Sequence, residues 1–169
     1  MVRIDSKLDD ILTSVLRRLI ANVADANESN CYLSMDEDAL PLDWAADFVY
    51  AVCPTGGEFD QQLMDGGGAS QATSDDQLVV RVFSMTTLDQ SRRDNLFLTH
   101  STAGVIERMR QVVKALAMYD AEQVGDTEDT LLRNPLLPIR YSFGRGDGER
   151  IVGYGAIAFG YSHDWDLTT

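Results

Sequence analysis

QLVVRVFSMTT, at residues 77–87, is the stretch of this sequence that decides the fold. Its valines and phenylalanine favour a β-strand, and no glycine or proline interrupts the run. A second strand-like run, WAADFVYAVC at residues 44–53, ends at Pro54. The order of strand, connection and strand predicts a β-hairpin with a long loop at residues 54–76.

One amphipathic helix is predicted on each side of this hairpin. Over residues 6–23, apolar residues recur at spacings of three and four, and Ser6 opens a pattern that resembles a capping box. A second apolar stripe begins at Val105. We expect Thr102 to cap this second helix, which should run to about Tyr119.

The last third of the chain predicts a second hairpin. PIRYSF at residues 138–143 and a long strand at residues 150–167 flank the turn dipeptide Asp147-Gly148. The acidic residues 24–43 predict a connection with little regular structure. The expected order is therefore α-β-β-α-β-β, a single α+β domain over residues 1–169 with two hairpins in one sheet packed by two main helices.

The negative charge of the chain is concentrated in one region. The net charge is −13, yet no lysine or arginine occurs between Arg18 and Arg81. Twelve acidic residues lie in that interval: Asp25, Glu28, Asp36, Glu37, Asp38, Asp43, Asp47, Glu58, Asp60, Asp65, Asp75 and Asp76. This distribution argues against tight DNA binding by phosphate neutralisation. It fits a solvated acidic face, a surface that repels nucleic acid, or one that meets a basic partner.

The glycine-rich segment PTGGEFDQQLMDGGGAS at residues 54–70 raises the question of a phosphate-binding loop. A P-loop needs a lysine and a following helix, whereas this segment has no lysine and precedes a strand. The dinucleotide-binding fingerprint is absent as well. The segment is therefore interpreted as a hairpin tip and candidate assembly loop, with these residues: Gly56, Gly57, Glu58, Asp60, Asp65, Gly66, Gly67 and Gly68.

No catalytic or metal-binding pattern stands out elsewhere. His163 and Asp164 would point to opposite faces of a strand, and His100 lies far from both in sequence. Cys31 and Cys53 lack metal spacing and a nucleophile signature, and we interpret them as reduced, partly buried thiols. We expect no enzyme activity, cofactor, metal, membrane span or secretory signal.

Arg92 and Arg93 interrupt the acidic character of the chain between the main strand and the second helix. They fit either a solvated loop or a basic contact with the acidic region of a neighbouring copy. The second interpretation suits a head-to-tail interface, in which two different patches meet and the rotation closes a ring.

In the order of its elements, the chain resembles the tail terminator proteins of long-tailed phages and related tail-completion and neck proteins. Four segments carry the resemblance: the helix at 6–23, the strand at 77–87, GVIERMRQVVKALA at 104–117, and the ending IAFGYSHDWDL at 157–167. The likeness covers nearly the whole chain.

The resemblance implies a structural virion protein in the tail or neck, assembled in the host cytoplasm. Such a protein forms a ring, typically a hexamer, that stops growth of the tail tube and joins it to the head connector. The implied partners are further copies of the chain, the tail tube protein and connector or adaptor proteins. DNA would pass through an acidic lumen without specific binding. Two alternatives stay open: another neck, head-closure or tube-like subunit, and a small cellular α+β binding domain.

Overall fold

The computed structural model describes residues 5–6, 8–35, 46–60, 71–84, 104–121, 131–145 and 153–166. Eight elements follow one another along this part of the chain. They are β1 (Asp5–Ser6), α1 (Leu8–Asn22), β2 (Cys31–Leu33), β3 (Phe48–Phe59), β4 (Gln71–Ser84), α4 (Val105–Leu116), β5 (Leu132–Arg145) and β6 (Gly153–Asp166).

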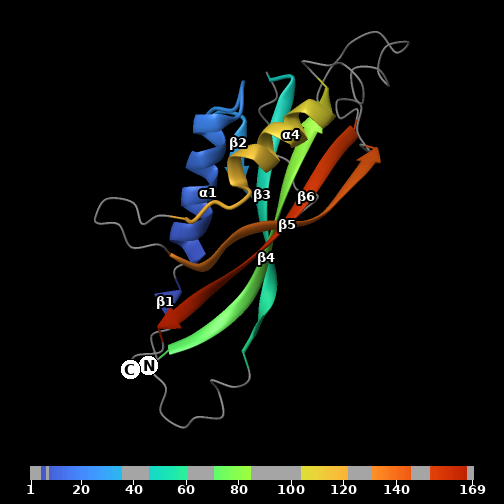
Figure 1. Ribbon diagram of the computed structural model, residues 1–169. Coiled ribbons are helices and arrows are strands. Elements are labelled where there is room, and N and C mark those ends of the chain that lie inside the picture. The colour runs from blue at the N-terminus through green and yellow to red at the C-terminus, as the bar shows by residue number, and fades with distance from the viewer. Residues whose placement is uncertain are drawn as a thin grey trace.

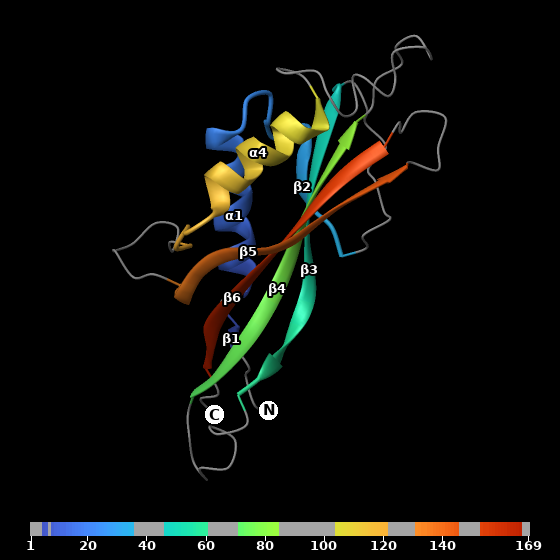
Figure 2. The ribbon, with the colours of Figure 1, turned by 45° about the vertical axis from the view of Figure 1, so that its right-hand side comes forward.

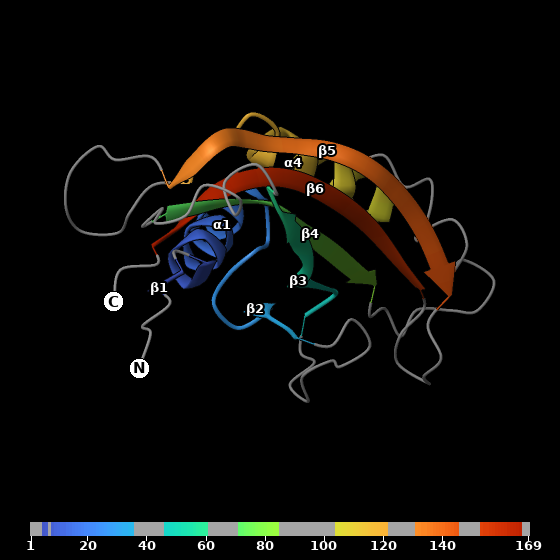
Figure 3. The ribbon, with the colours of Figure 1, turned by 90° about the horizontal axis from the view of Figure 1, so that it is seen from below.

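All six strands belong to one mixed sheet (Figure 1). β6 pairs along its full length with β4, and its other edge is shared by β5 and the short β1. β3 pairs antiparallel with β4, and β2 adds a parallel strand beyond it. Seen from below, β5 and β6 form a long curved ribbon (Figure 3). The α+β class is confirmed, but the sheet is larger than two hairpins.

Both helices lie on the same side of the sheet (Figure 2). Each buries an apolar stripe, as its sequence spacing predicts, and the two stripes share one core with the strands. The largest fully buried residues of this core include Ile11, Leu19, Leu116, Tyr50, Leu78, Ile157 and Phe159. The two helices therefore form one layer that packs on one face of the sheet.

A smaller apolar cluster lies on β3 and β4, on the face of the sheet that points away from the helices. It consists of Val49, Ala51, Cys53 and Phe83, and the ring of Phe83 lies 5.8 Å from that of Tyr154. Burial on both faces explains why these strands are continuous apolar runs rather than alternating ones.

Both cysteines are buried free thiols. Burial raises the pKa of Cys31 to about 12, although a backbone hydrogen bond to Asn27 opposes the rise. A thiol with such a pKa stays protonated and unreactive at neutral pH. The structure buries both side chains almost completely, more than the partial burial expected from the sequence.

A polar cluster joins the turn after α1 to β3 and α4. The hydroxyl of Tyr50 donates a hydrogen bond to Asp25 Oδ1 at 2.8 Å, and Arg108 Nη2 lies 3.3 Å from Asp25 Oδ2. Burial raises the pKa of Asp25, with Tyr50 and Arg108 opposing the rise. The cluster therefore holds three segments together through one carboxylate.

The predicted helices exist, but their first residues differ from expectation. Ser6 lies in β1, opposite Trp165 of β6, and α1 begins at Leu8. The N-cap of α4 is Gly104, which has extended backbone and no side-chain capping bond. The predicted cap Thr102 lies outside the described residues. At Gly104 the extended backbone, rather than a capping side chain, sets the start of α4.

The first hairpin has longer strands than predicted, so the expected loop at 54–76 is too long. β3 continues to Phe59, and β4 begins at Gln71. Asp60 N still donates a hydrogen bond to Thr73 O at 2.9 Å. The long loop was predicted because glycines and acidic residues are uncommon in strands. Pairing with β4 overrides the low strand propensity of these residues.

The acidic connection predicted at residues 24–43 contains the strand β2. Asn30, directly before it, donates through Nδ2 to Phe48 O at 3.1 Å, and its carbonyl accepts from Tyr50 N at 2.8 Å. Three residues are too few for a strand pattern to be recognised in sequence. Long-range hydrogen bonds to β3 position β2.

Candidate functional site

The structure describes four of the predicted assembly-loop residues. Gly56, Gly57 and Glu58 lie on β3, and Asp60 follows it directly. The remaining predicted site residues lie outside the described ranges: Asp65, Gly66, Gly67, Gly68, Arg92 and Arg93.

Gly56 and Gly57 are required by the pairing of β3 with β4. Gly56 has φ of 87° and lies where the register shifts after Pro54, which is a β-bulge position that favours glycine. A Cβ on Gly57 would lie 2.6 Å from Asp76 Cα and would also collide with the Asp75 carbonyl oxygen. These two glycines therefore shape a strand and do not cradle a phosphate.

An acidic concavity lies at this end of the hairpin. We define the acidic end as Glu58, Asp60 and Asp75, which all line the concavity and are all exposed. Thr55, Gly56, Gly57, Phe59 and Gln77 complete the lining, so no described lining residue is basic. The acidic end presents negative charge in a hollow of the surface, which excludes a phosphate ligand there on electrostatic grounds.

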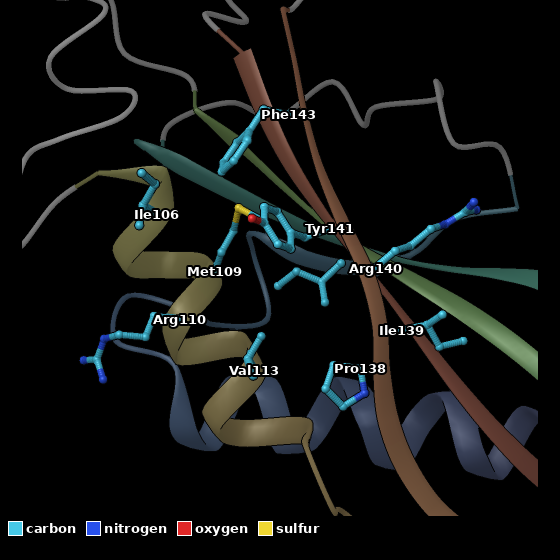
Figure 4. A pocket seen from close by; sticks show the side chains of 10 residues that line it. Ile106, Met109, Arg110, Val113, Pro138, Ile139, Arg140, Tyr141 and Phe143 are labelled. Carbon is cyan, nitrogen blue, oxygen red and sulfur yellow. The ribbon is translucent and has the colours of Figure 1, made fainter.

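A second hollow, the α4–β5 groove, runs between the helix α4 and the strand β5 and encloses about 540 Å³. Met109 of α4 and Tyr141 of β5 face one another across it, whereas Arg110, Arg140 and Ile139 point away from it (Figure 4). Its lining is mostly apolar: Ile106, Met109, Val113, Pro138, Ile139, Tyr141, Phe143 and Ile157, together with Arg110 and Arg140.

Large apolar side chains stay exposed in the α4–β5 groove. Tyr141 is 72% exposed and Ile139 54%, while Ile106 and Phe143 are more than two-fifths exposed. The rings of Tyr141 and Phe143 meet edge to face with centroids 6.0 Å apart. Exposed apolar side chains such as Ile106, Tyr141 and Phe143 are typical of surfaces that bind another molecule.

The two arginines of the α4–β5 groove differ in their contacts. Arg110 Nε and Nη2 each donate to the carboxylate of Glu107 at 2.7 Å, so its charge is already paired. No ion pair links Arg140 to another residue of the described ranges. The side chain of Arg140 points away from α4 (Figure 4) and lies with Val79 and Ala158 on the other face of the sheet, so its charge lies outside the groove.

A buried polar network joins β4 and β6, near the first residues of β4 and the last residues of β6. Trp165 Nε1 donates to Ser74 Oγ at 2.6 Å, Ser74 Oγ donates to Asp76 Oδ2, and His163 Nδ1 lies 2.8 Å from the same oxygen. His163 is fully buried, and Asp76 is 9% exposed. Burial alone would raise the pKa of Asp76, but the contacts with His163 and Ser74 hold it below its usual value.

The network contains serine, aspartate and histidine without the geometry of a catalytic triad. In a triad the serine contacts the histidine, which activates it, whereas Ser74 here contacts Asp76. No substrate could reach His163, because its side chain is fully buried. The network fixes the pairing of β4 with β6 and performs no nucleophilic chemistry in this arrangement.

Sequence reasoning missed this network because its members are far apart in the chain. It assigned no role to His163, whereas the structure buries that side chain completely. The register of β4 and β6 sets Ser74 opposite His163 and Asp76 opposite Tyr161. Only that register reveals the contact, because alternation along β6 shows which face His163 shares but not which residue of β4 it meets.

The described residues contain neither a cluster of metal ligands nor a helix that could span a membrane. No group of three or more histidine, cysteine, aspartate or glutamate residues there could hold a metal ion. Neither described helix is long and apolar enough to cross a membrane.

Comparisons with known proteins found a likeness in structure alone. No protein-family model matches the chain, and no curated protein matches it in sequence. The fold is similar to that of a chain in the virion of the native gene transfer agent particle, with a TM-score of 0.51 and 16% sequence identity. The match covers 90% of this chain and 94% of that one. At this identity the match establishes a shared fold.

Proposed function

We propose that this protein is a structural, non-enzymatic component of a phage-like virion. The observation that carries the proposal is the fold shared with a gene transfer agent virion chain over nearly the full length of both chains. A particle component needs surfaces for neighbouring chains. The exposed α4–β5 groove and the acidic end are two such surfaces.

Within that class, the proposed role is tail terminator. Copies of the chain would form a ring, expected to be a hexamer, that caps the tail tube and joins it to head connector or adaptor proteins. The order of helices and hairpins supports this role through its resemblance to tail terminators. The base-free stretch before Arg81 supports it as well, since negative charge facing the lumen would let DNA slide past without binding.

The proposal predicts a closed ring for the isolated protein. Native mass spectrometry of the purified chain should give one dominant multiple of its 18.7 kDa mass, and negative-stain electron micrographs should show rings with a central hole. Rings that stack into long tubes would instead favour a tube-like subunit. A monomer at high protein concentration would overturn the proposal and favour a cellular binding domain.

The inert DNA passage has a separate test. Double-stranded DNA should not be retarded by the ring in a gel at low salt, where electrostatic binding is strongest. Retardation that disappears as salt is raised would show phosphate contacts and would contradict the acidic lumen.

A further inference from the structure

We infer that the sheet continues from one copy of this chain to the next, with the β5 edge of one copy paired to the β2 edge of a second copy. This pairing sets Tyr141 of one copy opposite Leu33 of the other. The inference rests on the proposed function, because it names the subunit contact from which the ring would be built.

The sheet ends in two strands, β2 and β5, that lie at opposite edges (Figure 3). Among the described strands, β2 pairs only with β3, and β5 only with β6. The start of β5 is covered, because Leu136 N donates to Tyr119 O and Leu136 O accepts from Met118 N. Every residue from 137 to 143 is exposed. Proteins cover or blunt long edges of this kind, and an added strand is one way to cover them.

Exposed apolar side chains gather at these two edges. Of the nine large apolar residues that are exposed in the described ranges, six lie there. They are Leu33 and Met35 at the β2 edge, and Leu137, Ile139, Tyr141 and Phe143 on β5. Pairing of the two edges would remove part of this apolar surface from water, which favours association.

Leu33 and Tyr141 stand at the two ends of one row of paired residues across the sheet. The row is Leu33, Val52, Val80, Ile157 and Tyr141. A neighbouring copy that is displaced sideways, with no shift along the strands, therefore brings its Leu33 against Tyr141. The register of the sheet within one copy thus defines the register expected between copies.

The two side chains also lie on the same face of the sheet. Leu33 is two residues from Cys31, which packs in the core beneath the helices, so both point to the helix side. Tyr141 faces Met109 of α4 on that side (Figure 4). In the continued sheet the two side chains would form a cross-strand pair, and such pairs stabilise antiparallel strands.

The backbone groups at the two ends of the row match as well. Ser34 N donates to Val52 O at 2.9 Å, so Val52 points to β2 and Leu33, one residue before Ser34, points away from β3. Opposite residues in antiparallel strands either bond to each other or both point away. The partner of Val52 on β4 therefore bonds to β6, and Tyr141 directs its N–H and C=O to the open edge. Leu33 and Tyr141 can thus exchange two hydrogen bonds.

The directions of the strands permit this contact in a ring. β5 runs parallel to β4, since both are antiparallel to β6, whereas β2 and β3 run the opposite way. A copy rotated about an axis roughly along the strands therefore presents β2 as an antiparallel neighbour of β5. Because two different edges meet, the contact is head-to-tail, and its repetition closes a ring when the rotation allows it. Closure would leave neither edge open.

The charges of the neighbouring residues agree with this register. Like charges directly opposite one another destabilise a pair of strands. Continuing the antiparallel pairing on either side of Leu33 and Tyr141 sets Ser34 opposite Arg140 and Tyr32 opposite Ser142. The open edges therefore meet without opposed like charges, although the chain has a net charge of −13.

Cysteine cross-linking tests the register. Ser34→Cys and Arg140→Cys place thiols on opposite residues that do not bond to each other, whose Cα atoms lie about 4.5 Å apart in an antiparallel pair. This separation suits a disulfide. Mild oxidation of an equimolar mixture of the two variants should give a covalent dimer of twice the 18.7 kDa chain mass on a non-reducing gel.

Two controls accompany the cross-linking. Leu137→Cys, an exposed position elsewhere on β5, should give at least tenfold less dimer with Ser34→Cys than Arg140→Cys does. Wild type should give no dimer, because its native thiols Cys31 and Cys53 are buried. Equal yields for the cysteines at 137 and 140 would overturn the proposed register.

Substitutions test the contribution of the apolar pair. Leu33→Ser and Tyr141→Ser should each weaken self-association at least tenfold in sedimentation velocity over a concentration series. Because the two side chains meet, the double variant should lose less than the product of the two single losses. Met118→Ser, an exposed apolar replacement outside the pairing, should have no effect. Circular dichroism of each variant would establish that the monomer fold is kept.

These measurements separate the edge pairing from the proposed function. Native mass spectrometry reports whether wild type forms a ring. A ring that gives no cross-link and survives both serine substitutions would overturn the edge pairing and leave the virion role standing. A monomeric wild type would overturn both. Losses that simply multiply in the double variant would show that Leu33 and Tyr141 do not meet.

Discussion

His163 Nδ1 lies 2.8 Å from Asp76 Oδ2 in the interior, although the two residues are 87 positions apart in the chain. The contact joins neighbouring strands at the centre of the sheet, and Ser74 supports the carboxylate from the same strand as Asp76. Because both side chains are buried, each is the main compensation for the polarity of the other.

Replacing one member of this pair should be costly. His163→Ala leaves the buried Asp76 carboxylate with Ser74 as its remaining partner in the network, and we expect the free energy of unfolding to fall by about 3 kcal/mol. Urea denaturation followed by tryptophan fluorescence would measure the change. Glu58→Gln, an exposed substitution, should stay within about 0.5 kcal/mol of wild type. An equally small effect for His163→Ala would show that the pair adds nothing to stability.

Acid should remove the contribution of Asp76. Its pKa in the folded chain lies below the ordinary value of about 4. The folded state therefore favours the ionised carboxylate more strongly than the unfolded state does. The resulting stability is present above about pH 4 and is lost as the pH falls through the lower, folded pKa.

Denaturation midpoints between about pH 6 and pH 2 should therefore fall more steeply for wild type than for Asp76→Asn. Parallel curves for the two proteins would mean that this carboxylate is not responsible for the acid sensitivity. The control Glu58→Gln should follow the wild-type curve.

Gly56 and Gly57 should respond differently to substitution. Alanine at Gly57 meets the backbone of Asp75 and Asp76, so we expect a loss of about 1–3 kcal/mol. Open space surrounds Gly56, and only its φ of 87° opposes a side chain there. Asparagine tolerates positive φ, so Gly56→Asn should be milder than Gly57→Asn. Equal melting temperatures for the two asparagine variants would contradict this assignment.

The hydroxyl of Tyr50 should stabilise the junction of α1, β3 and α4. Tyr50→Phe keeps the ring and removes the hydrogen bond to Asp25, which leaves Arg108 as the remaining partner of that carboxylate among the described residues. We expect the free energy of unfolding, measured by urea denaturation, to fall by about 1–2 kcal/mol. Tyr141→Phe is the matched control, because that hydroxyl belongs to an exposed ring and its removal should cost little.

Arg92 and Arg93 remain predicted contacts between copies. Reversing both to glutamate should weaken self-association, because the acidic region of a neighbour would then meet like charge. Sedimentation velocity at low and high salt would show the effect, which should shrink as salt screens the charges. Unchanged association at low salt would favour the alternative of a solvated loop.

Periodicity predicted the elements that bury one continuous apolar stripe or run. The stripes of α1 and α4 and the valines of β4 fall into this group, because a helix or central strand must hide such residues from water. The two hairpins, β3 with β4 and β5 with β6, were also predicted correctly. Local pattern is informative where one segment carries enough apolar surface to determine its own conformation.

Features set by distant partners could not be predicted in this way. β2 has three residues and β1 two, and each exists because a longer strand offers it hydrogen bonds. The glycines of β3 suggested a loop, although pairing with β4 keeps them in a strand. Of the candidate site, the acidic end was foreseen from composition. The α4–β5 groove was not, since it depends on how β5 lies beside α4.

The place of β6 in the sheet has a consequence for biosynthesis. β6 follows β1, β4 and β5 in sequence, yet all three pair with it. None of these pairings can form until residues 153–166 have been translated and have left the ribosome. Until then β4 exposes an edge rich in valine, and nascent chains on neighbouring ribosomes could pair through it. We expect the unfinished chain to depend on chaperones that shield such edges, and premature assembly to be delayed until β6 is in place.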